Sequence, residues 1–252
     1  MSNQEKDELF VGWSADLPRA DRRFLLAASL GLVAVAGGAG ALMALAHESA
    51  VGGRWDGELR DWTGLLLAAP YPMLRTLDID GTPRTAFLAT SGKTAVRLPP
   101  RLPGQIVRVR ASLIARDNHA MLAVADGGDW IAASNAAPRG LTDWPESVGQ
   151  TVMLSGEILD AKCWFGAMRP GFGRTHKACA ALCARGGLPL AFCTNDVCAD
   201  GGEAPLLLDA AGRAHGRAIL PLVADPVLVR GRLVQVGDVT QLRADIEAIS
   251  RF

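Results

Sequence analysis

The chain has 252 residues, of which 49% are hydrophobic and 21% are charged, so it can fold as one large domain or two small ones rather than remain disordered. Its 26 basic and 26 acidic side chains give a formal charge of zero. This balance argues against general nucleic-acid binding, which usually requires a basic protein. Only four of the basic residues are lysines, a bias that, with the many alanines and glycines, is typical of GC-rich bacterial genes.

A membrane-spanning helix is predicted near the N-terminus, where residues 24–46 form an uncharged apolar run of 23 residues, long enough to cross a bilayer. Three arginines precede the run: Arg19, Arg22 and Arg23. The positive-inside rule therefore places the N-terminal tail in the cytoplasm and the bulk of the chain in the periplasm, as in a single-pass protein of a bacterial inner membrane. A cleaved signal peptide is the alternative, because Ala44-Leu45-Ala46 resembles a cleavage site, but the run and its preceding flank are long for one.

Small residues recur four positions apart in this predicted helix, in the pairs Ala34/Gly38, Ala36/Gly40 and Gly37/Ala41. Such spacing lets the backbone of a second membrane helix approach closely. The pattern predicts packing against another integral membrane protein. The alternative is that glycine and alanine are simply common in membrane helices encoded by GC-rich genes.

The remainder of the chain is predicted to be mainly β and internally duplicated. Short alternating apolar runs are separated by Gly, Pro, Asp and Asn, which is typical of strands and turns. Residues 87–93 resemble residues 207–213 at an offset of 120, and the same offset pairs Val107 with Val227. The first strands match at an offset of only 92, so the second copy contains about 28 additional residues between its first and second strands.

Each copy is predicted to contain five strands, near 62–69, 85–90, 94–98, 105–116 and 119–125 in the first and near 151–160, 205–209, 218–223, 226–236 and 239–248 in the second. A long fourth strand that turns tightly into the fifth resembles the OB-fold, a small Greek-key barrel. A β-sandwich is the alternative. The resemblance is one of strand pattern and brings no functional motif, and the single tyrosine and 6% aromatic content argue against the nucleic-acid binding common among OB-folds.

The predicted organisation is a cytoplasmic tail (1–23), a transmembrane helix (24–46), a linker (47–59), a first OB-like domain (60–135), a second linker (136–149) and a second OB-like domain (150–252) with a Cys-rich helical insertion (162–203).

All five cysteines lie in this insertion. Residues 175–184 are predicted to form a short helix, with Thr175 as its N-cap and Gly186-Gly187 at its end. On that helix His176, Cys179 and Cys183 are spaced i, i+3 and i+7, and so share one face.

Two interpretations of the cysteines follow. In an oxidising compartment a long insertion is stabilised by disulfides, and at most two bridges leave one thiol. Cys179 and Cys183 would then pair with Cys163, Cys193 or Cys198 rather than with each other. In the second interpretation Cys163, His176, Cys179 and Cys183 form a Cys3His metal site, whose ligand types suit zinc, copper or an iron–sulfur centre.

The insertion is also basic, with no acidic residue between Asp160 and Asp196. Arg169 and Arg174 flank a Gly-rich turn that leads into the predicted helix, and Lys177 follows. Free backbone N–H groups at that helix start, together with these side chains, predict a site for an anion or an acidic protein partner. A solvated basic loop is the alternative.

We find no nucleophile elbow, P-loop or zinc-protease motif, so no catalytic residue is assigned and a non-catalytic role is favoured. The leading hypothesis is a membrane-anchored accessory or assembly subunit of a bacterial membrane complex, with redox complexes as one class, that uses the Cys-rich loop as its interaction site. The alternative is an electron carrier or chaperone that binds a metal or cofactor at the Cys3His site.

Overall fold

The computed structural model describes residues 18–46, 52–77, 81–136, 140–142, 144–194, 197–198 and 201–252. Most of the predicted cytoplasmic tail and part of both predicted linkers therefore lie outside the described residues. The chain divides into two compact units, residues 1–50 and residues 51–252.

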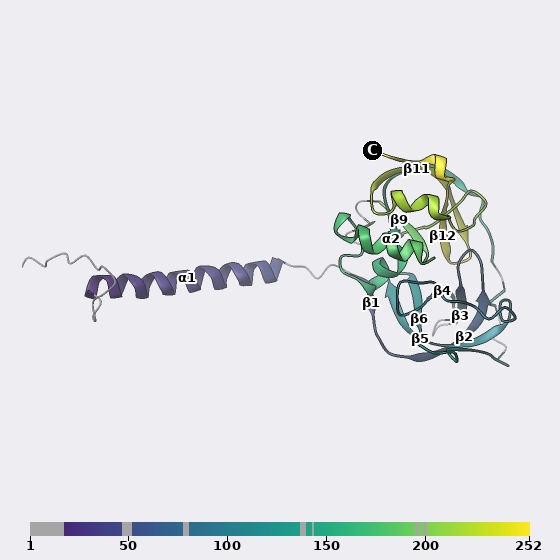
Figure 1. Cartoon of the computed structure of the whole chain (residues 1–252), viewed down its shortest axis with the longest axis horizontal. Helices are drawn as coiled ribbons and strands as arrows, with labels where there is room; N and C mark the ends of the chain where they lie inside the picture. Colours follow the sequence, from purple (N-terminus) through teal and green to yellow (C-terminus); the bar gives the residue numbers. More distant parts are fainter. Residues whose placement is uncertain are drawn as a thin grey trace, which may run out of the picture. The chain divides into compact units, whose positions relative to one another are not determined.

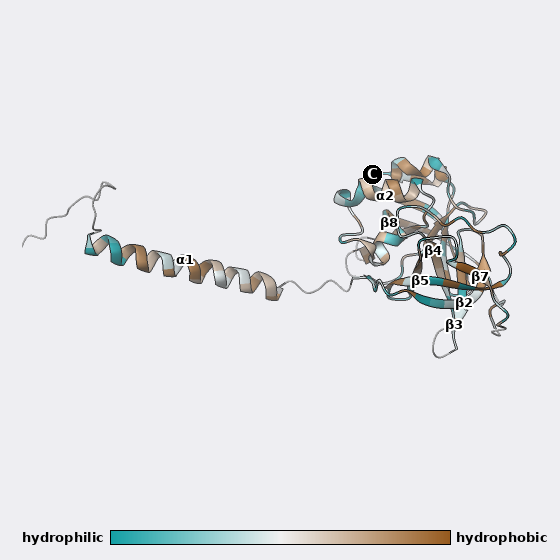
Figure 2. Ribbon diagram, turned by 60° about the horizontal axis from the view of Figure 1, so that its bottom comes forward, coloured by the Kyte–Doolittle hydropathy of each residue, from teal (hydrophilic) through white to brown (hydrophobic). Residues whose placement is uncertain are grey.

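The described part of the first unit forms the helix α1 (Arg19–Ala46), of 28 residues. It is long and apolar enough to cross a membrane, and Figure 2 shows its apolar residues along most of its length. The helix starts five residues before the predicted apolar run, because the arginine-containing segment 19–23 is helical as well. At about 1.5 Å per residue it exceeds the roughly 30 Å of a hydrocarbon core.

The second unit is mainly β (Figure 1). Its strands are β1 (Arg54–Trp55), β2 (Arg60–Leu67), β3 (Met73–Leu77), β4 (Pro83–Ala89), β5 (Ile106–Arg116), β6 (His119–Val124), β7 (Ile131–Ala133), β8 (Gln150–Asp160), β9 (Leu190–Cys193), β10 (Leu206–Leu208), β11 (Pro226–Val236), β12 (Val239–Arg243) and β13 (Ile249–Arg251). The first sheet has the order β5-β2-β3-β4-β6 and closes through pairing of β6 with β5. The second has the order β11-β8-β9-β10-β12 and closes through β12 and β11. These two closed five-stranded barrels confirm the predicted fold class.

The strand register confirms the duplication. Gly64 lies opposite Val107 in the first barrel, and Gly156 lies opposite Val227 in the second, which are the offsets of 92 and 120 found in the sequence. Both glycines are required by close strand packing: a Cβ at Gly64 would lie 2.3 Å from a backbone oxygen of β3, and one at Gly156 would lie 2.0 Å from a backbone oxygen of β9. The parallel pairs β4–β6 and β10–β12 are also equivalent.

Two predicted strands are wrong. Residues 94–98 form only an isolated bridge at Ala95, and residues 218–223 lie mostly in a 3-10 helix, η3 (Arg217–Leu222). Pro221 lies within η3, and proline cannot donate to a strand ladder. The second strand of each barrel is instead β3 and β9, which the sequence pattern missed.

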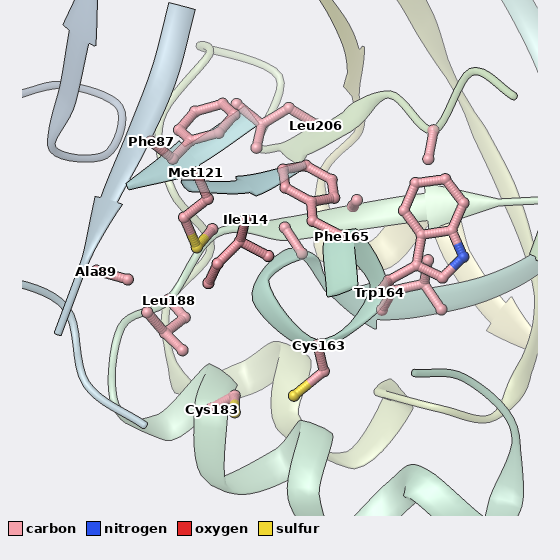
Figure 3. Close-up of a cluster of buried hydrophobic side chains, with 14 of the residues drawn as sticks. Phe87, Ala89, Ile114, Met121, Cys163, Trp164, Phe165, Cys183, Leu188 and Leu206 are labelled. Carbon is pink, nitrogen blue, oxygen red and sulfur yellow. The ribbon is translucent and has the colours of Figure 1, made fainter. Parts of the chain in front are cut away.

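A hydrophobic cluster joins the two barrels. It contains Phe87 and Met121 from the first barrel, Leu206 from the second, and Trp164 and Phe165 from the insertion, and Figure 3 shows these side chains gathered together. Trp164 and Phe165 are only 1% and 2% exposed. The Cys-rich insertion therefore supplies part of the core between the barrels rather than a separate loop on the surface.

Truncation of a core side chain should destabilise the second unit. Leu242 on β12 is fully buried in the core of the second barrel, so Leu242→Ala should lower the free energy of unfolding by about 2–5 kcal/mol. Val148 is 97% exposed, so Val148→Ala is the matched control and should change it by less than about 0.5 kcal/mol. Denaturant unfolding of the full chain in detergent, followed by tryptophan fluorescence, measures both; equal effects would contradict the assigned core.

Candidate metal centre

The insertion begins directly after β8, where one carboxylate fixes the local backbone. Asp160, the last residue of β8, is fully buried. Its Oδ1 accepts a hydrogen bond of 2.9 Å from the backbone N–H of Cys163. This bond holds the start of the short helical turn η1 (Cys163–Ala167) and so sets the position of the first cysteine.

The predicted helix is confirmed, with a different start. A 3-10 turn, η2 (Arg174–His176), leads into α2 (Lys177–Arg185). The residue before α2 is His176, which makes no side-chain cap, so the predicted capping by Thr175 is wrong. Gly186 follows α2 and Gly187 takes a positive φ of 83°, which is a common way for a helix to end.

Three thiols gather between η1 and α2. The sulfur atoms of Cys163, Cys179 and Cys183 all lie within 4.8 Å of one another, and those of Cys163 and Cys179 are 3.7 Å apart. Cys163 and Cys183 are buried, and Cys179 is half-buried. Figure 3 shows the sulfur of Cys163 turned towards Cys183, on the side of the hydrophobic cluster away from Phe87 and Leu206.

The disulfide pattern differs from the predicted one. Cys193 is bonded to Cys198, so neither is available to Cys179 or Cys183, and the other three thiols are free. The pairing is local: β9 ends at Cys193, Cys198 follows five residues later, and their Cα atoms are 5.3 Å apart. The expectation that the helix cysteines pair with these two residues is therefore wrong.

The sulfur spacing fits two ligands on one ion. Bonded sulfurs lie about 2.05 Å apart, whereas two thiolates about 2.3 Å from a tetrahedral zinc ion lie about 3.8 Å from each other. The 3.7 Å between Cys163 and Cys179 matches the second value. Soft sulfur ligands suit copper(I), zinc or iron–sulfur chemistry.

His176, the fourth predicted ligand, lies beside the thiols but is directed to a carboxylate. Its Nε2 is 2.9 Å from Asp160 Oδ2, and both side chains are buried. Asp160, Cys163 and His176 form a second group whose potential ligand atoms lie within 4.8 Å of one another. His176 is therefore next to Cys163, but among the described residues it does not form one such group with all three cysteines.

Two lysines, which sequence reasoning missed, supply positive charge at the thiols. Lys93, in the first barrel, donates to Cys179 Sγ over 2.6 Å. This contact, together with the nearby cysteines, raises the pKa of Lys93. Because Lys93 is 86 residues from Cys179, only the packing of the barrels brings them together, and no sequence spacing indicates it.

Lys162 lies near the thiols of Cys163 and Cys183 and joins the barrels. Its amine donates to the carbonyl oxygens of Thr90, Ser91 and Gly92, over 2.6, 2.9 and 2.6 Å. All three ammonium hydrogens thus have an acceptor. Burial lowers the pKa of Lys162, while Cys183 and Cys163 oppose that shift.

The pKa values of the Cys163 and Cys183 thiols are shifted in opposite directions. The hydrogen bond between them raises the pKa of Cys163, and burial adds to this effect. The same bond lowers the pKa of Cys183, which is therefore the acceptor. The cluster thus favours a thiolate at Cys183, the form that binds metal ions.

The predicted anion-binding residues have contacts within the protein. The Arg169 guanidinium donates to the Gly53 carbonyl oxygen over 3.0 Å, and Lys177 pairs with Asp225. Arg174 is exposed. The backbone N–H of Gly173, just before η2, donates to Glu157 Oε1 over 2.8 Å, so a carboxylate of the chain itself occupies part of the predicted anion position. Binding of an external anion or acidic partner stays a prediction.

No protein-family model, curated protein or solved structure matches this chain in the comparisons made.

The half-buried Glu157 should make stability depend on pH. Burial raises the pKa of Glu157 above its ordinary value of 4.5, so the folded state binds more protons than the unfolded state from about pH 4.5 up to the raised value. Stability should therefore fall as the pH rises through that range. Glu157→Gln keeps an acceptor for Gly173 and removes the charge.

The free energy of unfolding, measured by denaturant titration at several pH values, tests this assignment. As the pH rises through that window, the free energy of unfolding of Glu157→Gln should increase relative to that of the wild type. If the difference between the two free energies did not change with pH, the pKa of Glu157 would not be raised in the folded protein.

Proposed function

We propose that the chain is a membrane-anchored, extracytoplasmic protein that binds one soft metal ion through Cys163, Cys179 and Cys183. The observation that carries this proposal is the gathering of three free thiols at a sulfur spacing of 3.7 Å, beside a separate disulfide. Free thiols in an oxidising compartment tend to form disulfides, so three that remain close but unbonded are well explained as ligands.

The number of sulfur ligands favours copper(I) over zinc. Three sulfur ligands suit copper(I), whereas structural zinc usually takes four ligands. Should zinc bind instead, His176 is the residue nearest to completing a Cys3His set.

The site suits metal storage or delivery better than electron transfer. Soft thiolates stabilise copper(I) selectively and disfavour the harder copper(II) state, so cycling between the two is not supported. Cys179 is half-buried while Cys183 is 1% exposed, which gives an incoming thiol one accessible sulfur at which ligand exchange can start. A carrier or chaperone for copper is therefore the proposed role.

The anchor and the disulfide support the proposed location. The helix α1 is apolar enough to cross a membrane, and the Cys193–Cys198 disulfide is consistent with an oxidising compartment. With arginines at its N-terminal end, we place the N-terminus in the cytoplasm and the barrels in the periplasm of a bacterial inner membrane.

Such an anchored carrier would serve as an accessory or assembly subunit of a membrane complex. The Ala34/Gly38 spacing on α1 provides a surface at which a partner helix can approach. This role is a second step that does not affect the metal proposal.

Reduced full-length protein in detergent should bind one equivalent of copper(I). Replacement of one ligand, as in Cys183→Ser, should weaken binding by more than the 10–100-fold typical of outer-sphere changes. Competition with a chromophoric copper(I) chelator measures the affinity. The double variant Cys193→Ser/Cys198→Ser removes two sulfurs outside the cluster and should keep near-wild-type affinity. Equal losses in both variants, or no stoichiometric copper, would overturn the assignment.

The partner role is tested through the helix. Gly38→Leu adds bulk to the small-residue surface of α1, and should reduce co-purification of a membrane partner while leaving copper binding unchanged. Leu30→Ile, a substitution that adds no bulk, is the control. Affinity purification from mild detergent followed by mass spectrometry measures partner recovery. The role would be rejected if the full chain always purified alone.

A further inference from the structure

The contact between Lys93 and Cys179 is too short for an ordinary hydrogen bond to sulfur. Lys93 Nζ and Cys179 Sγ are 2.6 Å apart. Hydrogen bonds from nitrogen to the smaller oxygen atom are usually about 2.9 Å long, so a bond to sulfur should be longer still. Two covalent bonds through one bridging oxygen span about the distance observed.

The backbone on both sides fixes this contact. The Lys162 amine binds the three carbonyl groups that precede Lys93. On the other side, the N–H of Ala95 donates to the Gly186 carbonyl oxygen over 2.9 Å. A Cβ at Gly186 would lie 1.9 Å from the Lys93 carbonyl oxygen, so the end of α2 meets the loop backbone directly. Lys93 is thereby held beside Cys179 by the packing of the two barrels.

We propose that Lys93 and Cys179 form a covalent N–O–S crosslink when molecular oxygen reaches the metal-free protein. Lys93 is exposed and Cys179 is half-buried, so oxygen can reach both atoms. The thiols of Cys179, Cys183 and Cys163 act on the charge of Lys93 and raise its pKa.

The reaction balances with oxygen as the sole oxidant. The ammonium and thiolate of the pair have the same composition as an amine and a thiol, and together they contribute three hydrogens. One oxygen atom enters the bridge, forming one N–O bond and one O–S bond, and the O–O bond breaks. The second oxygen leaves as water with two of the hydrogens, and the third stays on nitrogen. Nitrogen and sulfur each lose two electrons, which together reduce one molecule of oxygen.

The crosslink extends the proposed function without depending on it. A bridged Cys179 cannot donate its thiolate to a metal ion, so crosslinking and metal binding exclude each other. The link would also join the first barrel covalently to α2. Oxidation would thus prevent the metal-free protein from binding a metal ion, and a thiol reductant would restore binding.

Non-reducing digestion and mass spectrometry of the metal-free full chain, purified in detergent and exposed to air, test the proposal. The expected product joins the peptides that contain Lys93 and Cys179, with one oxygen gained and two hydrogens lost relative to their sum. Reduction with dithiothreitol should release both unmodified peptides. The Cys193–Cys198 disulfide, detected in the same digest, reports that the protein is folded.

Two lysine variants separate the specific link from general oxidation. Lys93→Arg should abolish the product, while Lys177→Arg, whose parent side chain pairs with Asp225, should leave it unchanged. A Cys163–Cys179 disulfide as the sole oxidised product, or complete alkylation of all three thiols after air exposure, would overturn the crosslink. The copper titration does not depend on this measurement, so failure of the crosslink proposal can be distinguished from failure of the metal proposal.

Discussion

The buried amine of Lys162 is the contact on which the candidate site depends. It donates to the carbonyl oxygens of Thr90, Ser91 and Gly92, and so attaches the insertion of the second barrel to a loop of the first. Lys162 is only 3% exposed, and burying its ammonium group without these acceptors would be costly. The same contact places Lys93 at Cys179. The interface between the barrels is thus also one wall of the thiol cluster.

The junction is strengthened by aromatic and polar contacts on its other side. The guanidinium of Arg116 lies 4.2 Å from the ring centroid of Trp164 and donates to its carbonyl oxygen. His119 stacks on Phe165 at a ring-centroid distance of 5.0 Å, and burial lowers its pKa, which favours the neutral imidazole. These contacts rigidify η1, which carries Cys163. Since a metal site requires fixed ligands, the aromatic core and the thiol cluster act as one structural unit.

The sequence predicts the local parts of this arrangement and misses those set by packing. The i, i+4 spacing of Cys179 and Cys183 indicates a shared helix face, because helical periodicity is a local property. The duplication likewise predicts both barrels. The pairing of Cys193 with Cys198 depends on β9, a four-residue strand hidden within the insertion. The partner of His176 is Asp160, whose only local signal is its position three residues before Cys163.

The duplication also explains how Lys93, a residue of the first copy, comes to contact the cysteines of the second. At the offset of 120, Lys93 corresponds to Arg213 and Ala89 corresponds to Asp209. In the second barrel Arg213 binds Asp209 over 2.9 Å, so that turn closes on itself. In the first barrel the carboxylate is replaced by the methyl group of Ala89, which leaves the equivalent cation without its local partner. Lys93 therefore reaches across the interface to Cys179 in the insertion of the second copy.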